Sequence, residues 1–138
     1  MSRILVAVSS PWAAKKVADT VADLAKRLDA EVLVIHVSRP SGGQMRQHEQ
    51  VDGEEAINLF RQSLQGRGLI VQTLLLFSED VAQAILNIAN EYHVSLIVLG
   101  LTAKNVFARL IAGNVPVELI KNTPIPVLLL PPDWNGVV

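Results

Sequence analysis

The chain has 138 residues, of which 50% are hydrophobic, with no cysteine and a formal net charge of −1. This length suits one compact domain with a substantial core, so we expect a single domain over residues 1–138. The near-neutral charge argues against nucleic acid and anionic membranes as partners, and the lack of cysteine excludes disulfides and thiolate chemistry. No apolar run is long enough for a membrane span and the N-terminus lacks a signal-peptide pattern, so we expect a cytoplasmic protein.

Five apolar runs along the chain predict β-strands. The first run is continuously apolar and the others are mostly so, which is typical of parallel strands that are buried on both faces of a sheet. In chain order the predicted strands cover residues 4–8, 31–37, 69–77, 94–99 and 125–130.

Between these strands, apolar residues recur every three or four positions and predict helices. The first helix begins at Pro11, and Ser78 or Asp80 caps the third. Residues 38–53 contain a proline and several glycines, so we expect a flexible connection there. The helical segments are marked by Val17, Val21, Leu24 and Leu28, by Ile57, Phe60 and Leu64 within residues 54–65, by Val81, Ile85, Ile88 and Tyr92, and by residues 114–122.

The strict alternation of strand and helix predicts an α/β domain, a parallel sheet with helices on both faces. Ligands of such sheets bind at the carboxyl ends of the strands, where the direction of winding reverses. Gly100 follows the fourth strand and Gly113 precedes the fourth helix. Backbone N–H groups at such positions can hold an anion, so nucleotide binding is the first hypothesis.

A resemblance to a known family rests on residues 4–8, 31–37 with the pair His36-Val37, 94–100 and 124–128. In these segments the chain resembles the universal stress protein family, and the similarity covers nearly its whole length. The resemblance implies a five-stranded parallel sheet in the order 3-2-1-4-5. This is the Rossmann-like, adenine nucleotide alpha hydrolase-like fold, usually found as a homodimer.

The resemblance extends to the phosphate-binding segment. Family members that bind ATP carry glycine, two residues, glycine, nine residues, then glycine followed by serine or threonine. Here the spacing is kept by Gly100, Ala103, Gly113 and Asn114, with alanine in place of the middle glycine and asparagine in place of the hydroxyl residue. The Asn114 side-chain amide can still donate a hydrogen bond to an oxyanion.

Two further positions differ from the ATP-binding members. The aspartate that follows the first strand is Ser9 here, and a later hydroxyl residue is Pro116, which also lacks a backbone N–H. Lys104 and Arg109 lie in the same segment and supply positive charge for phosphate. AMP, or another adenine nucleotide with few phosphates, requires less of this segment than ATP does.

The function implied by the resemblance is regulatory: a homodimer that senses an adenine nucleotide, ATP or an AMP-like molecule, in a stress response and acts on an unidentified protein partner. The alternative is a nucleotide-free dimeric interaction module that has lost ATP binding. The fold itself requires no cofactor. The nucleotide-binding residues that we expect are Ala7, Ser9, Val37, Leu99, Gly100, Ala103, Lys104, Arg109, Gly113, Asn114 and Val115.

No arrangement of residues predicts catalysis. Ser9-Ser10 lacks the G-x-S-x-G pattern of a nucleophile elbow, and no pair of carboxylates is positioned for acid/base work, so we expect no enzymatic activity. His36, His48 and His93 lack the spacing of metal ligands, so we expect no metal site. His36 ends a buried strand, where we expect a hydrogen-bonded structural role.

The last strand is predicted at an edge of the sheet, because Pro124 and Pro126 precede or enter it. An apolar edge is an aggregation hazard unless something covers it. Pairing with the same strand of a second subunit about a two-fold axis would cover Val127, Leu128 and Leu129. Alternatively, residues 131–134 cover part of this edge.

Overall fold

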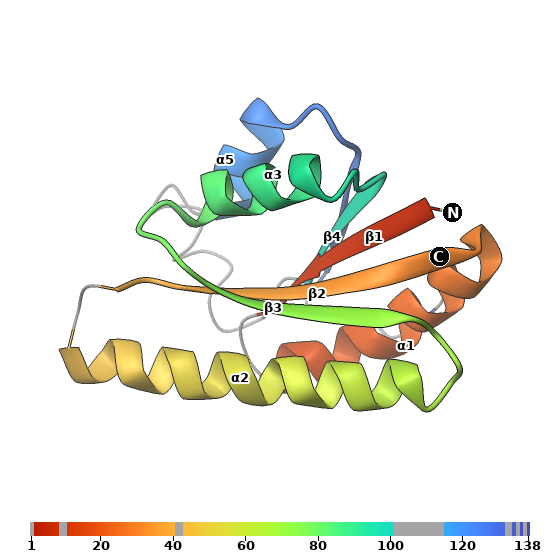
Figure 1. The fold of residues 1–138 in the computed structure, drawn as a ribbon, viewed down its shortest axis with the longest axis horizontal. Coiled ribbons are helices and arrows are strands. Elements are labelled where there is room, and N and C mark those ends of the chain that lie inside the picture. The colour runs from red at the N-terminus through yellow and green to blue at the C-terminus, as the bar shows by residue number, and fades with distance from the viewer. Residues whose placement is uncertain are drawn as a thin grey trace.

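The computed structural model describes residues 2–8, 11–40, 43–100, 115–131, 134, 136 and 138, without the side chains of residues 11–14, 16 and 43–49. Its strands and helices alternate along the chain (Figure 1). They are β1 (Ser2–Ala7), α1 (Pro11–Leu28), β2 (Ala30–Ser38), α2 (Gly43–Gln65), β3 (Val71–Phe77), α3 (Val81–Glu91), β4 (Leu96–Gly100), α5 (Val115–Asn122) and β5 (Val127–Leu130).

The strands form one five-stranded sheet in the order β3-β2-β1-β4-β5, and every neighbouring pair is parallel. This confirms the predicted fold. Helices α1 and α2 cover one face of the sheet, and α3 and α5 cover the other (Figure 1). Strand β1 is central, and Ala7 is paired in register with Ile35 of β2 and with Leu99 of β4.

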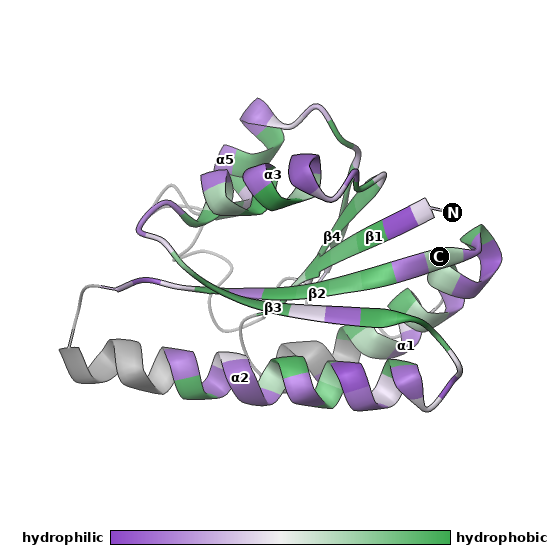
Figure 2. Cartoon of the chain, in the orientation of Figure 1, coloured by the Kyte–Doolittle hydropathy of each residue, from purple (hydrophilic) through white to green (hydrophobic). Residues whose placement is uncertain are grey.

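The core consists of two apolar clusters, one on each face of the sheet. Along β1, Ile4 and Val6 belong to the cluster under α1 and α2, whereas Leu5 belongs to the cluster under α3. Successive strand residues point to opposite faces, so a strand that is covered on both sides must be apolar throughout. Figure 2 shows this pattern, with hydrophobic central strands and hydrophilic residues on the helices.

The predicted starts of α1 and α3 agree with the structure. Helix α1 begins at Pro11, as expected. Of the two caps proposed for α3, Asp80 is the N-cap, and its carboxylate accepts a hydrogen bond of 3.1 Å from the Gln83 N–H. Such a cap satisfies one of the backbone donors that a helix start leaves free.

The connection expected over residues 38–53 is wrong, because α2 already begins at Gly43. Residues 44–50 are mostly glutamine, methionine, arginine and glutamate, which are good helix formers. The prediction of a connection rested on Pro40, Gly42 and Gly43, whereas the helix also contains Gly53, although glycine inside a helix costs about 1 kcal/mol relative to alanine.

Gly53 is required by a contact between α2 and β2. A Cβ atom at this position would lie 2.1 Å from Cδ2 and 2.2 Å from Nε2 of His36. Real Cβ atoms do not approach other heavy atoms so closely, so the His36 ring occupies the space that any larger residue would fill. Gly53 therefore allows α2 to pack closely on the sheet, although glycine is a poor helix former.

We predict that Gly53→Ala lowers the free energy of unfolding by about 1–3 kcal/mol, although alanine is the better helix former. Chemical denaturation of the two proteins measures the difference. The double variant His36→Ala/Gly53→Ala is the control, because removal of the ring removes the clash. In that background the alanine at position 53 should be neutral or stabilising, and a loss of the same size there would contradict the packing explanation.

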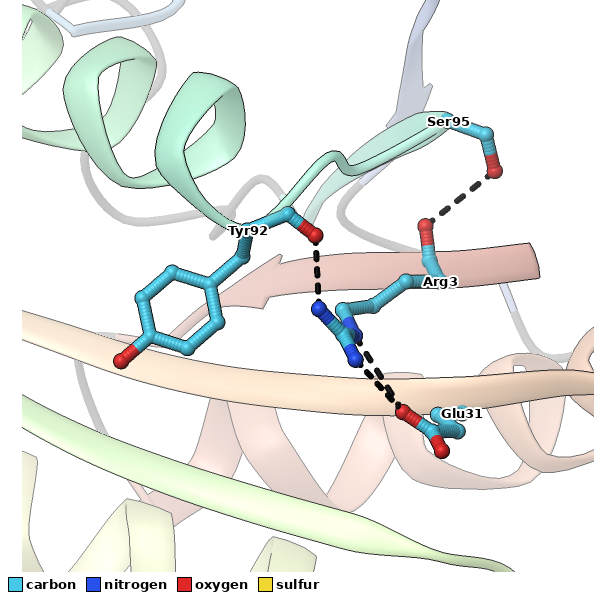
Figure 3. A network of polar contacts seen from close by, with 4 residues as sticks. All are labelled: Arg3, Glu31, Tyr92 and Ser95. Atoms are coloured by element: carbon cyan, nitrogen blue, oxygen red, sulfur yellow. Dashed lines mark hydrogen bonds and ion pairs between the residues drawn. The ribbon is translucent and has the colours of Figure 1, made fainter. Parts of the chain in front are cut away.

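A polar network closes the amino end of the sheet (Figure 3). The Arg3 guanidinium donates to Glu31 Oε2 at 2.9 and 3.2 Å and to the Tyr92 carbonyl at 2.7 Å. It also lies 5.9 Å from the centroid of the Tyr92 ring. Since Tyr92 is the C-cap of α3, one cation joins β1 and β2 to the negative end of this helix. Ser95 completes the network, because its backbone N–H donates to the Arg3 carbonyl at 2.9 Å.

We predict that Arg3→Lys lowers the free energy of unfolding by about 1 kcal/mol, because one ammonium group cannot reproduce the planar contacts with Glu31 and Tyr92. The matched control is Arg67→Lys, whose partner Asp19 has a side chain 76% exposed. That exposed pair should contribute less than about 0.5 kcal/mol. Equal losses in the two variants, measured by denaturation, would count against a special role for Arg3.

Candidate functional site

The sheet has a switch point between β1 and β4. From β1 the chain passes through α1 to β2 on one side, whereas β4 lies on the other side and is reached from β3 through α3. Helix α1, which follows β1, covers one face of the sheet, and α5, the next described helix after β4, covers the other. The strand ends between these two helices are therefore accessible to a ligand. Ala7 and Leu99 are register partners here, each at or next to the carboxyl end of its strand.

The structure brings together four of the predicted site residues: Ala7, Val37, Leu99 and Val115. All four belong to or pack against the apolar cluster under α3 and α5. The side chains of Val37 and Leu99 are committed to the core, with 7% and 6% of their residue surfaces exposed. These four residues lie on the α3 side of the sheet near the carboxyl ends of β1, β2 and β4, and they are called the apolar floor below.

Gly100 ends β4 and faces the opposite side of the sheet, towards α1. A Cβ atom at this position would lie 2.5 Å from Cγ2 of Val17. Because valine is branched at Cβ and stiff about its first torsion, the methyl group cannot easily move away. Glycine here lets α1 approach the end of β4, a packing role that the sequence analysis did not predict.

Several predicted site residues lie outside the described residues: Ser9, Ala103, Lys104, Arg109, Gly113 and Asn114. The described helix α5 begins at Val115, directly after them. Pro116 lies in its first turn, where the missing N–H costs no intrahelical hydrogen bond. The same turn carries the acidic residue Glu118, which is exposed. Its charge opposes the attraction of this helix start for further anionic groups.

His36 has the hydrogen-bonded role that was expected, and its second ring nitrogen is buried. Its Nδ1 lies 2.8 Å from the carbonyl oxygen of Val8. A carbonyl only accepts, so Nδ1 donates this hydrogen bond. Among the described residues, the buried Nε2 has no hydrogen-bond partner, and neither does the hydroxyl of Ser38 on the same face of β2. The sequence alone does not indicate that these two polar groups are buried. Burial of the His36 ring depends on its contact with Gly53 of α2, and no helix was predicted at that position.

The described part of the chain shows neither a metal site nor a helix that could span a membrane. No group of three or more histidine, aspartate or glutamate residues lies together there in a way that could hold a metal ion. Among the helices that the structure describes, none combines the length and the apolar character needed to cross a membrane.

The solved structures that share this fold include three universal stress proteins. A universal stress protein from Archaeoglobus fulgidus is 24% identical with a TM-score of 0.75, and the match covers 94% of this chain and 98% of that one. The universal stress protein from Archaeoglobus fulgidus in complex with dAMP is 21% identical, with a TM-score of 0.70 and coverage of 94% and 97%. A universal stress protein family protein from Arabidopsis thaliana with AMP bound is 16% identical, with a TM-score of 0.70 and coverage of 95% and 92%.

Similarity at these identities shows the fold alone, and no protein of curated function matches the sequence. Membership of a family rests instead on the sequence model of the universal stress protein family, which matches residues 1–131. The matched segment includes every strand and helix described above. This chain therefore belongs to the universal stress protein family.

Proposed function

We propose that this protein is a regulatory member of its family that binds an adenine nucleotide at the switch point, as a homodimer, and signals the bound state to a protein partner. The observation that carries the proposal is the apolar floor of Ala7, Val37, Leu99 and Val115 at the carboxyl end of the sheet. The flat apolar faces of a purine suit such a surface. The dAMP and AMP complexes of two proteins of the same fold support the choice of ligand.

In this proposal each expected residue has a part in binding. Ala7, Ser9 and Val37 surround the base, and Leu99 and Gly100 lie beneath the ribose and phosphate. The remaining residues bind the anion: Lys104 and Arg109 by charge, and Ala103, Gly113, Asn114 and Val115 by backbone or amide N–H groups. Binding alone carries the signal, so no chemical step is assigned to the site.

The start of α5 favours a nucleotide with few phosphates. Pro116 provides no N–H, and Glu118 places a negative charge in the same turn. Ala103 and Asn114 replace two of the residues that ATP-binding members use. A monophosphate needs fewer donors and meets less repulsion than a triphosphate does, so AMP is the proposed ligand.

The test is a thermal-shift titration with AMP, ADP and ATP, each with and without Mg²⁺. AMP at 100 times its dissociation constant should stabilise the fold by about 2.7 kcal/mol, and ATP should give the smallest shift at equal concentration. Gly113→Trp, which places a large side chain where backbone donors are proposed, should abolish the AMP shift.

The nucleotide-free interaction module makes the opposite prediction. It requires that no adenine nucleotide shifts the unfolding temperature of the folded protein. Under that alternative, the combined change Ala103→Gly, Asn114→Ser and Pro116→Ser should create ATP binding that the unaltered protein lacks. A shift with AMP in the unaltered protein excludes the alternative.

The proposed dimer uses the outer edge of β5. This strand forms one edge of the sheet, and its residues Val127, Leu128 and Leu129 are partly exposed. The described part of the C-terminal segment binds to α1 instead: Trp134 Nε1 donates to Thr20 Oγ1 at 2.9 Å. Within the described residues no backbone hydrogen bond joins that segment to β5, which supports an edge available to a second subunit.

We predict that cysteine placed at position 127, 128 or 129 forms a disulfide-linked dimer under mild oxidation in at least one of the three variants. The natural chain has no cysteine, so each single substitution reports only on its own position. Near a two-fold axis a residue faces its own copy at about 4.5–5.5 Å between Cα atoms, within disulfide range. The control is Gln72→Cys, exposed on β3 at the other edge. Cross-linking of the control alone, seen on a non-reducing gel, would place the interface elsewhere.

A further inference from the structure

Just beyond the end of β1, the imidazole of His36 donates a hydrogen bond to the Val8 carbonyl, which would normally accept one from a backbone N–H. The Val8 N–H donates to the Ile35 carbonyl at 2.9 Å, which continues the parallel ladder one residue beyond β1. In a regular parallel ladder the carbonyl of that residue would accept from the Val37 N–H. Here the Val8 carbonyl accepts from His36 Nδ1 at 2.8 Å, and among the described residues no backbone bond joins Val37 to Val8.

Two unfavourable features accompany this bond. The ring is 2% exposed and its Nε2 has no partner among the described residues, and Gly53 weakens α2 so that the ring can fit. At the preceding position of β2 on the same face, Val34 fills the core with no such difficulty. A structure that needed only packing could use an apolar residue at position 36 and alanine at position 53. What the imidazole adds is the hydrogen bond to Val8.

We propose that His36 is a positioning residue for the ligand site at the switch point. Its bond holds the carbonyl of the peptide that leaves β1, and among the described residues no backbone bond to Val8 occupies the Val37 N–H at this end of the sheet. The ring lies on the α1 and α2 side of β2, whereas Ala7 and Val37 pack on the α3 side. His36 therefore does not touch a ligand on that floor, and it acts through Val8 and Val37. This inference rests on the proposed nucleotide site.

The first experiment needs no ligand and compares amide hydrogen exchange in His36→Leu and His36→Asn. The leucine variant frees the Val8 carbonyl to accept from Val37, so exchange of the Val37 amide, taken relative to the Ile35 amide in the same variant, should slow by about tenfold. The ratio to Ile35 removes any change in overall stability. The asparagine side chain carries an N–H on the same branch as Nδ1 and should keep the ratio of the unaltered protein.

The second experiment measures the dissociation constant for AMP. His36→Leu should weaken AMP binding by about tenfold. Residues that orient a metal ligand without touching the metal have effects of this size on metal affinity. His36→Asn should keep most of the affinity of the unaltered protein. The stability control is Ile57→Ala, a buried residue of α2 in the cluster that the His36 ring adjoins. It should lower the unfolding temperature while leaving the AMP dissociation constant unchanged.

The outcomes separate the two proposals. If the unaltered protein binds no adenine nucleotide, the proposed function fails, and the exchange ratio alone decides whether His36 positions the end of β1. The positioning role is overturned if the leucine variant keeps the original exchange ratio, or if it binds AMP as tightly as the unaltered protein. It is also overturned if Ile57→Ala weakens AMP binding as much as His36→Leu does.

Discussion

Burial of β1 on both faces is the constraint on which the rest of the molecule depends. This strand has β2 on one side and β4 on the other, and helices cover it above and below. Leu5 and Val6 have no exposed surface although they point in opposite directions. A strand in this position can only be apolar, so chemistry is possible only where the strand ends. Both the switch point and the polar network of Arg3 lie at such ends.

The same constraint explains why the fold could be predicted from the sequence. Continuous apolar runs such as residues 4–8 and 31–37 have few other solutions than a doubly covered parallel sheet, and the helices between them carry clear apolar faces. The predicted strands 69–77 and 125–130 begin two residues before β3 and β5 do, because Leu69, Ile70 and Ile125 are apolar although they precede the register-paired residues of these strands. Hydropathy does not reveal where the pairing of a strand begins.

The candidate site was only partly predictable, for a physical reason. Ala7, Val37 and Leu99 could be placed at strand ends by counting along the sequence, and the structure does bring them into one cluster with Val115. Two glycines have packing roles that the sequence analysis did not predict. Gly53 and Gly100 each leave room for a side chain from a distant element. The space that a glycine leaves for another element is a property of the tertiary structure, and no local pattern encodes it.

The Arg3 network divides the molecule into two ends with different tolerance to change. At the amino end, Arg3, Glu31 and the last turn of α3 are joined by a charged group with several partners, so the relative positions of three elements are fixed there. The carboxyl end of the sheet, where the ligand site is proposed, can then vary in sequence without loss of the fold, because these contacts at the amino end already hold β1, β2 and α3 together. Relatives with this arrangement would be free to exchange one small anionic ligand for another, or to lose it, through substitutions confined to the segment between β4 and α5.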